Sequence, residues 1–155
     1  MNIQHILVRL ATLGPIGLVR GGGTFASACT LPLIALLAFL KVSFFNYILC
    51  VVSVLVLALF AARAALPVYQ GLRDEDTKDP GEIVIDEVLG CLITFSGITI
   101  SWSSILWGFL IFRLLDINKP FGIKRLEYFY GPWGILFDDM AAGLYANLIL
   151  IIIGY

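Results

Sequence analysis

The sequence has little charge, a single histidine and only three cysteines. Of its 155 residues 14% are charged, against about 25% in an ordinary soluble domain, and 60% are hydrophobic. A soluble domain would have too few polar residues to cover its surface. Ten basic residues against eleven acidic ones give no positive excess for nucleic-acid binding, and an odd number of cysteines inside apolar runs argues against a disulfide scaffold. These absences predict one small, multispanning membrane domain over residues 1–155.

Several catalytic chemistries also lack their residues. None of the three cysteines has an arginine six residues later, as the Cys-x5-Arg pattern of a cysteine phosphatase requires. A Ser-His-Asp system would have to use His5, which has no motif around it, and the chain contains no P-loop.

Charge-free stretches give a first map of the membrane spans. They cover residues 24–40, 42–62, 88–112 and 140–155. A helix needs about 20 mostly apolar residues to cross a bilayer. Residues 3–13 carry apolar side chains at helical spacing, with His5 and Arg9 on the other side, which predicts a short interfacial helix.

The third stretch is too long for one crossing. Asp79, Pro80 and Glu82 suit the N-cap, N1 and N3 positions of a helix, and 37 residues from Pro80 to Asp116 would extend about 55 Å. A glycine and four serines at 96–104 favour a break into helices over about 80–97 and 101–116. With this break, nine of the ten basic residues lie on one side, leaving Lys41 opposite. We therefore expect an all-α protein with about five transmembrane helices, short interfacial helices, an inside N-terminus and an outside C-terminus.

This topology brings carboxylates from three spans to the cytoplasmic mouth of the bundle. Helical spacing places Asp86, Gly90 and Thr94 on one face, and Asp139, Gly143 and Asn147 on another. Small and polar faces pack against other helices in lipid, so the acids should point inward. They could simply complement helix dipoles, but ionisable residues within spans are usually functional, and clustered carboxylates repel unless a cation joins them. Hard oxygen ligands favour Mg²⁺.

Two loops have alternative interpretations. The glycines at 21–23 precede a span, where backbone N–H groups could cradle phosphate or form a flexible joint. Basic and aromatic residues alternate over 119–133, which is typical of an interfacial segment near anionic headgroups, or of an aromatic belt without a ligand.

Four sequence blocks resemble the phosphatidylglycerophosphatase A family. They are Gly-Gly-Thr-Phe-Ala-Ser at 22–27, Asp-Pro-Gly-Glu-Ile-Val-Ile-Asp-Glu at 79–87, Phe-Arg-Leu-Leu-Asp-Ile-Asn-Lys-Pro at 112–120 and Gly-Ile-Leu-Phe-Asp-Asp-Met-Ala-Ala-Gly at 134–143. Their order covers nearly the whole chain. The first block and the residues before the last one, Gly131-Pro132-Trp133-Gly134, depart from the usual family pattern.

The resemblance implies a Mg²⁺-dependent phosphatase of the bacterial inner membrane. Its substrate would be phosphatidylglycerophosphate, its product phosphatidylglycerol, and its site would face the cytoplasm. The expected metal ligands are Asp86, Glu87, Asp138 and Asp139, with Asp79 a weaker candidate. Arg113, Lys119 and Thr24 would bind substrate, and Asp116 would orient Arg113 or carry a proton. Catalysis would then rest on Asp86, Glu87, Arg113, Asp116 and Asp139, with water as the expected nucleophile and an aspartyl-phosphate as the alternative.

Two other classes of function use the same residues. A small ion- or proton-coupled transporter could use the carboxylates as a relay, but it should place them near the membrane midplane. A non-catalytic lipid-binding or assembly subunit would have no turnover to lose when charges are removed.

Overall fold

The computed structural model describes residues 2–73 and 80–155, and within these ranges the protein is helical without strands. The predicted all-α class is confirmed. Asp79 lies outside the described residues. The α-helices are α1 (Ile3–Ala11), α2 (Gly22–Phe39), α3 (Phe44–Arg73), α4 (Ile85–Thr94), α5 (Trp102–Asn118) and α6 (Pro132–Ile152), with 3₁₀ helices η1 (Ile16–Leu18) and η2 (Ile123–Tyr128) between them.

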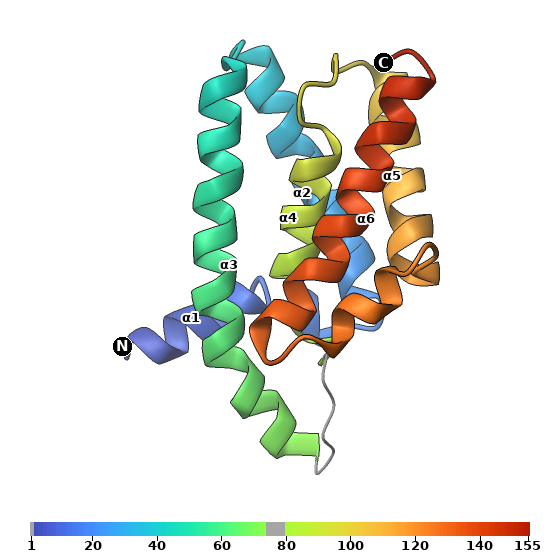
Figure 1. Ribbon diagram of the computed structural model, residues 1–155. Helices are drawn as coiled ribbons and strands as arrows, with labels where there is room; N and C mark the ends of the chain where they lie inside the picture. The colour runs from blue at the N-terminus through green and yellow to red at the C-terminus, as the bar shows by residue number, and fades with distance from the viewer. Residues whose placement is uncertain (1, 74–79) are drawn as a thin grey trace.

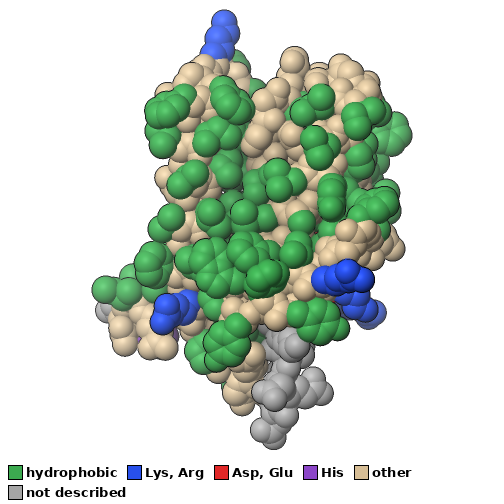
Figure 2. Space-filling model, viewed as in Figure 1, with side chains coloured by type: hydrophobic (Ala, Val, Ile, Leu, Met, Phe, Trp, Pro, Cys, Tyr) green, Lys and Arg blue, Asp and Glu red, His purple; other side chains and the backbone are tan. Residues whose placement is uncertain are grey.

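Three of these helices are long and apolar enough to cross a membrane. They are Gly22–Phe39, Phe44–Leu72 and Pro132–Ile152. Figure 2 shows a broad band of apolar side chains on one face, with Lys and Arg side chains above and below it. The N-terminus and the C-terminus lie toward opposite ends of the bundle (Figure 1). These features support a membrane protein.

The predicted break in the third apolar stretch is confirmed. α4 ends at Thr94 and α5 begins at Trp102. Gly97 has a φ of +74°, which glycine adopts without strain, and Ser101 caps α5 by accepting a hydrogen bond from the Ser104 backbone N–H at 3.1 Å. The chain therefore reverses direction here.

The predicted start of this hairpin at Pro80 is wrong. α4 begins at Ile85, because the Val84 N–H donates to the Ala11 carbonyl at 2.8 Å and the Ile83 N–H donates to the Pro80 carbonyl at 2.9 Å. With 10 residues α4 extends about 15 Å, too short to cross a hydrocarbon core of about 30 Å as a helix. Among the described residues, three helices rather than five are long and apolar enough to cross a membrane, and five crossings remain a prediction.

Two other helices are longer than their charge-free cores. α6 begins at Pro132 rather than near Met140, and α3 continues past Ala62 to Arg73. Charge-free stretches identify the apolar centre of a helix, whereas its ends continue into charged sequence. Asp138 and Asp139 consequently lie inside α6.

α1 is the predicted amphipathic helix, and it runs across α3 at one end of the bundle (Figure 1). Its Ala11 is buried in a cluster with Ala58, Ala62 and Ala65 of α3, while Ile3 is exposed. The small alanines allow the two helices to approach closely. Through the Val84–Ala11 hydrogen bond, α1 is also joined to the chain that enters α4.

α4 is the central helix, with eight of its ten residues buried (Figure 1). Leu89 and Ile93 pack in the cluster shared with α3, and Leu92 packs in a second cluster with Phe112 of α5. Because the starts of α2, α4 and α6 and the end of the antiparallel α5 meet at one end of the bundle, their polar residues can come together there.

Candidate phosphatase site

Two glycines set the distance between α4 and α6. A Cβ on Gly143 would overlap the Gly90 carbonyl oxygen, and a Cβ on Gly90 would lie 2.7 Å from the Asp139 carbonyl oxygen. Farther along, the Asn147 side chain donates to the Thr94 and Ser96 carbonyls, both at 2.9 Å. The two predicted helix faces therefore pack against each other, which confirms the inward orientation inferred from their spacing.

This packing gathers three carboxylates. Asp86 and Glu87 come from the first turn of α4, and Asp139 comes from α6. One oxygen from each lies within 4.8 Å of the others. Asp86 and Asp139 are only 5% and 3% exposed, so their negative charges are poorly screened by water. A cation at their centre would relieve this repulsion.

The donor set fits a hard divalent cation. All three residues offer carboxylate oxygens, the ligands that Mg²⁺ and Ca²⁺ prefer over nitrogen or sulfur. Within the described part of the chain, Asp139 Oδ2 is buried and has no hydrogen-bond partner. A buried oxygen of this kind normally has a partner, and a bound ion would supply it.

Arg113 lies beside the carboxylates at the end of α5. Its Nη1 is 2.6 Å from Asp116 Oδ2, one turn along the same helix, and 3.9 Å from Glu87 Oε1. Arg113 and Asp116 are both largely buried, so the pair fixes the direction of the guanidinium group. The site thus combines three clustered carboxylates with the guanidinium group of Arg113, which Asp116 holds in place.

The first turns of α2 also contact Arg113 and the acidic cluster. Arg113 Nη2 donates to Thr24 Oγ1 at 3.2 Å, and Nη1 donates to Ser27 Oγ at 3.4 Å. Gly23 lies so close to Glu87 that a Cβ on Gly23 would overlap the Glu87 carboxylate. The glycines before Thr24 therefore allow α2 to approach the acids.

Asp138 and Lys119 form a separate pair. Lys119 Nζ lies 2.5 Å from Asp138 Oδ2 and 2.6 Å from Glu127 Oε1 of η2. Although Asp138 adjoins Asp139 in sequence, its carboxylate contacts this lysine rather than the three-acid cluster. The structure thus brings together Asp86, Glu87, Arg113, Asp116, Asp139 and Thr24, and places Lys119 and Asp138 beside them in an ion pair.

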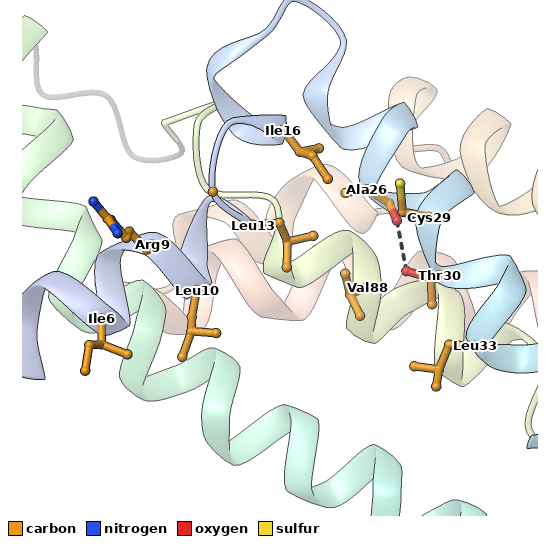
Figure 3. A pocket seen from close by; sticks show the side chains of 11 residues that line it. Ile6, Arg9, Leu10, Leu13, Ile16, Ala26, Cys29, Thr30, Leu33 and Val88 are labelled. Atoms are coloured by element: carbon orange, nitrogen blue, oxygen red, sulfur yellow. Dashed lines mark hydrogen bonds between the residues drawn. The ribbon is translucent and has the colours of Figure 1, made fainter.

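An apolar cavity lies on the side of α2 and α4 that faces away from the acidic cluster. Its volume is about 560 Å³, and Leu10, Leu13, Leu33 and Val88 are among the residues that line it (Figure 3). Val88 follows Glu87 directly, so the cavity wall and the acidic cluster share the first turn of α4. A hydrophobic chain could lie near the polar site without entering it.

Two residues of this region were not predicted. Ser27 lies three residues after Thr24, a spacing that puts both hydroxyls on one helix face, and this signal was available in the sequence. Glu127 reaches Lys119 only because η2 turns back toward α5, and no local pattern indicates this contact.

Known proteins with similar sequences bear on this site. The sequence pattern of the phosphatidylglycerophosphatase A family matches residues 9–154. Phosphatidylglycerophosphatase A of Escherichia coli is 33% identical over 135 residues, which are 86% of this chain and 74% of that protein. The Haemophilus influenzae protein of the same name is 39% identical over 84 residues, covering 53% of this chain and 52% of its own length.

A third relative, from Bacteroides thetaiotaomicron, is named as a candidate phosphatidylinositol-3-phosphatase. It is 32% identical over 76 residues, 47% of this chain and 48% of its own length. No solved structure matches the chain. Since the family pattern covers nearly the whole sequence, the chain belongs to the phosphatidylglycerophosphatase A family of phosphatases.

Proposed function

We propose that this protein hydrolyses the terminal phosphomonoester of phosphatidylglycerophosphate to give phosphatidylglycerol and inorganic phosphate. The observation that carries the proposal is the position of Arg113 beside the Asp86, Glu87 and Asp139 carboxylates. The relatives from E. coli and H. influenzae are named for this substrate, which supports the same choice here. The apolar cavity behind Glu87 suits a substrate with acyl chains.

Asp86, Glu87 and Asp139 would hold Mg²⁺, which when bound would offset phosphate charge and activate a water molecule. Arg113 would bind phosphate oxygens through its N–H groups, and Asp116 would keep the guanidinium in place. In the reaction, a water oxygen bonds to phosphorus, the bond from phosphorus to the glycerol oxygen breaks, and that oxygen takes a proton. A carboxylate of the site accepts the proton lost by the water, and this proton is the one that the glycerol oxygen takes.

Asp138 is a weaker ligand candidate than its neighbour, because its carboxylate is engaged by Lys119. For the same reason, Lys119 would support the site mainly by holding η2 and α6 together. Thr24 would help to hold Arg113 and could also contact a phosphate oxygen.

We also propose that the protein lies in the bacterial inner membrane with this site at the cytoplasmic face. In this topology α4, its flanking segments and α5 form a hairpin between the long helices, which gives five crossings. The separation of Lys41 from the other nine basic residues supports that orientation. The acids lie near one end of the bundle, whereas a transporter would be expected to place its polar site near the midplane.

The decisive experiment measures phosphate release by purified protein in detergent micelles containing phosphatidylglycerophosphate. We expect release with Mg²⁺, loss in EDTA and recovery when Mg²⁺ is returned. Phosphatidylinositol 3-phosphate serves as the parallel substrate, since one relative is named for it. Full turnover in chelator would remove the metal from the mechanism. No release from phosphatidylglycerophosphate with Mg²⁺ would contradict the proposed activity.

A further inference from the structure

A second cavity, which is lined by basic residues, lies at the turn that joins α5 to η2. Its volume is about 620 Å³. The turn is tight because Lys119, Phe121 and Gly122 have φ values of +46°, +55° and +85°. Only the last of these is a glycine, so the backbone here is held in a conformation that side chains seldom adopt. The lining residues are Lys119, Phe121, Gly122, Lys124, Arg125 and Tyr128.

The charges that line this cavity are all positive. Lys119 is engaged by Glu127 and Asp138, but Lys124 and Arg125 are exposed, and over residues 2–73 and 80–155 neither forms an ion pair. Two adjacent cations that line a cavity attract an anion. Because Arg can bind two oxygens through its planar fork, a phosphate group suits the pair.

The cavity lies beside a membrane-spanning helix. The exposed Phe121 ring packs edge-to-face on Tyr145 of α6, with the ring centroids 6.0 Å apart. Exposed aromatic residues next to basic ones are typical of the membrane–water interface, the level at which phospholipid phosphates lie. The anion expected here is therefore the phosphate of a lipid headgroup.

The cavity also adjoins the candidate phosphatase site. Lys119 belongs to its wall, and its ammonium group contacts Asp138, the residue before Asp139. Lys119 also follows Asp116 by three residues at the end of α5. This helix end therefore contributes one residue to the cavity and one to the candidate phosphatase site. The proposed substrate has two phosphates joined by one glycerol, a terminal monoester and a diester to the lipid.

We propose that the cavity at Lys124 and Arg125 binds the phosphodiester of the lipid substrate while its monoester lies at Arg113 and the three carboxylates. This inference rests on the proposed function. It explains how the protein would distinguish a headgroup with two phosphates from a lipid with one, because only the former can occupy both places.

The test uses the double variant Lys124→Gln/Arg125→Gln in the full-length protein. Both side chains are exposed, so their replacement should not disturb packing. We expect KM for phosphatidylglycerophosphate to rise roughly 30-fold, the loss anticipated when two interfacial cations are removed. The matched control is Arg20→Gln/Arg63→Gln, which removes two exposed basic residues away from the cavity and should change KM by less than about twofold.

Direct binding of phosphatidylglycerol in zwitterionic-detergent micelles gives a second readout that needs no turnover. This lipid carries the diester without the monoester, so its affinity should fall roughly 30-fold in the test variant and not in the control. Inhibition by inorganic phosphate, which reports the monoester site, should be the same in both proteins.

Three results would overturn the proposal. Equal losses of affinity in the test and control variants would indicate non-specific attraction to anionic surfaces. A loss of phosphatidylglycerol binding with an unchanged KM would mean that the cavity binds a lipid other than the substrate. Unchanged binding and KM would remove the site altogether. A separate result would contradict the proposed function itself. If the wild type releases no phosphate, but the test variant still binds phosphatidylglycerol more weakly than the wild type, the cavity is an anionic-lipid site without a role in catalysis.

Discussion

Gly143 of α6 packs directly on the backbone of Gly90 in α4, and no side chain fits between them. A Gly143→Ala substitution should push the two helices apart and separate Asp139 from Asp86 and Glu87. Overpacking of this kind costs about 1–3 kcal/mol, so we expect a lower melting temperature and a clear loss of turnover. Thermal unfolding in detergent measures the first effect.

The control is Gly71→Ala in α3, where a Cβ would meet nothing within 4 Å. Alanine favours a helix over glycine by about 1 kcal/mol, so this variant should be neutral or slightly more stable. If Gly143→Ala behaved like Gly71→Ala, the helix contact would not determine the geometry of the acids.

Removal of one negative charge from the three-acid cluster should abolish most turnover. Asp86→Asn and Asp139→Asn keep the side-chain shape, and electrostatic groups of this type contribute about 2.7–4 kcal/mol to catalysis, or roughly 10²–10³-fold in kcat. Both variants should also bind Mn²⁺, used as a spectroscopic substitute for Mg²⁺, more weakly than the wild type. Asp76→Asn, outside the described residues and outside the family blocks, is the matched control. Folded Asp86→Asn and Asp139→Asn proteins with normal turnover would mean that these two acids have no role in the chemistry.

Asp116 should act through Arg113. We expect Arg113→Lys to lower turnover on the order of 10²-fold, because a point charge cannot replace the planar fork on phosphate. Asp116→Asn should cost less, and in the Arg113→Lys background it should cost almost nothing further. A double-mutant cycle on kcat/KM measures this coupling. Additive losses would instead indicate an independent role for Asp116, such as proton transfer.

Asp138 should contribute to stability more than to chemistry. Asp138→Asn removes one of the negative charges that contact the partly buried Lys119, and we expect the free energy of unfolding to fall by about 1–3 kcal/mol. Activity measured well below the melting temperature should remain dependent on Mg²⁺. The opposite pattern, an unchanged melting temperature with turnover abolished, would make Asp138 a metal ligand.

Membrane orientation can be tested with impermeant thiol reagents. In a protein without its native cysteines, Ser101→Cys should be labelled from the outside of intact cells, whereas Lys124→Cys should be labelled only after the membrane is opened. Both positions are exposed, Ser101 at the start of α5 and Lys124 in η2, so they are accessible if they reach water. Labelling of Lys124→Cys from outside would overturn the five-crossing arrangement.

Local patterns predicted much of this structure. Gly97 and Ser101 marked the break between α4 and α5, and the spacing of Gly90, Gly143 and Asn147 identified the faces on which α4 and α6 pack. These features depend on residues close together in sequence or on helical periodicity. A single sequence is therefore enough to recognise them.

The features that were missed depend on contacts between distant segments. α4 starts late because the Val84 N–H bonds to Ala11, more than 70 residues earlier in the chain. The η2 turn likewise decides that Lys119 meets Glu127 and Asp138. No periodicity encodes such contacts, since they arise only when the helices are assembled.

The hydrogen bond from Val84 to Ala11 joins the surface helix to the segment that enters the acidic site. Asp86 follows Val84 by two residues, so a tilt of α1 that keeps this bond would move the turn that carries Asp86 and Glu87. An amphipathic helix responds to lipid packing, curvature and composition. The activity of this protein should therefore vary with the physical state of the surrounding bilayer, so that the membrane acts as a regulator of an enzyme that modifies its lipids.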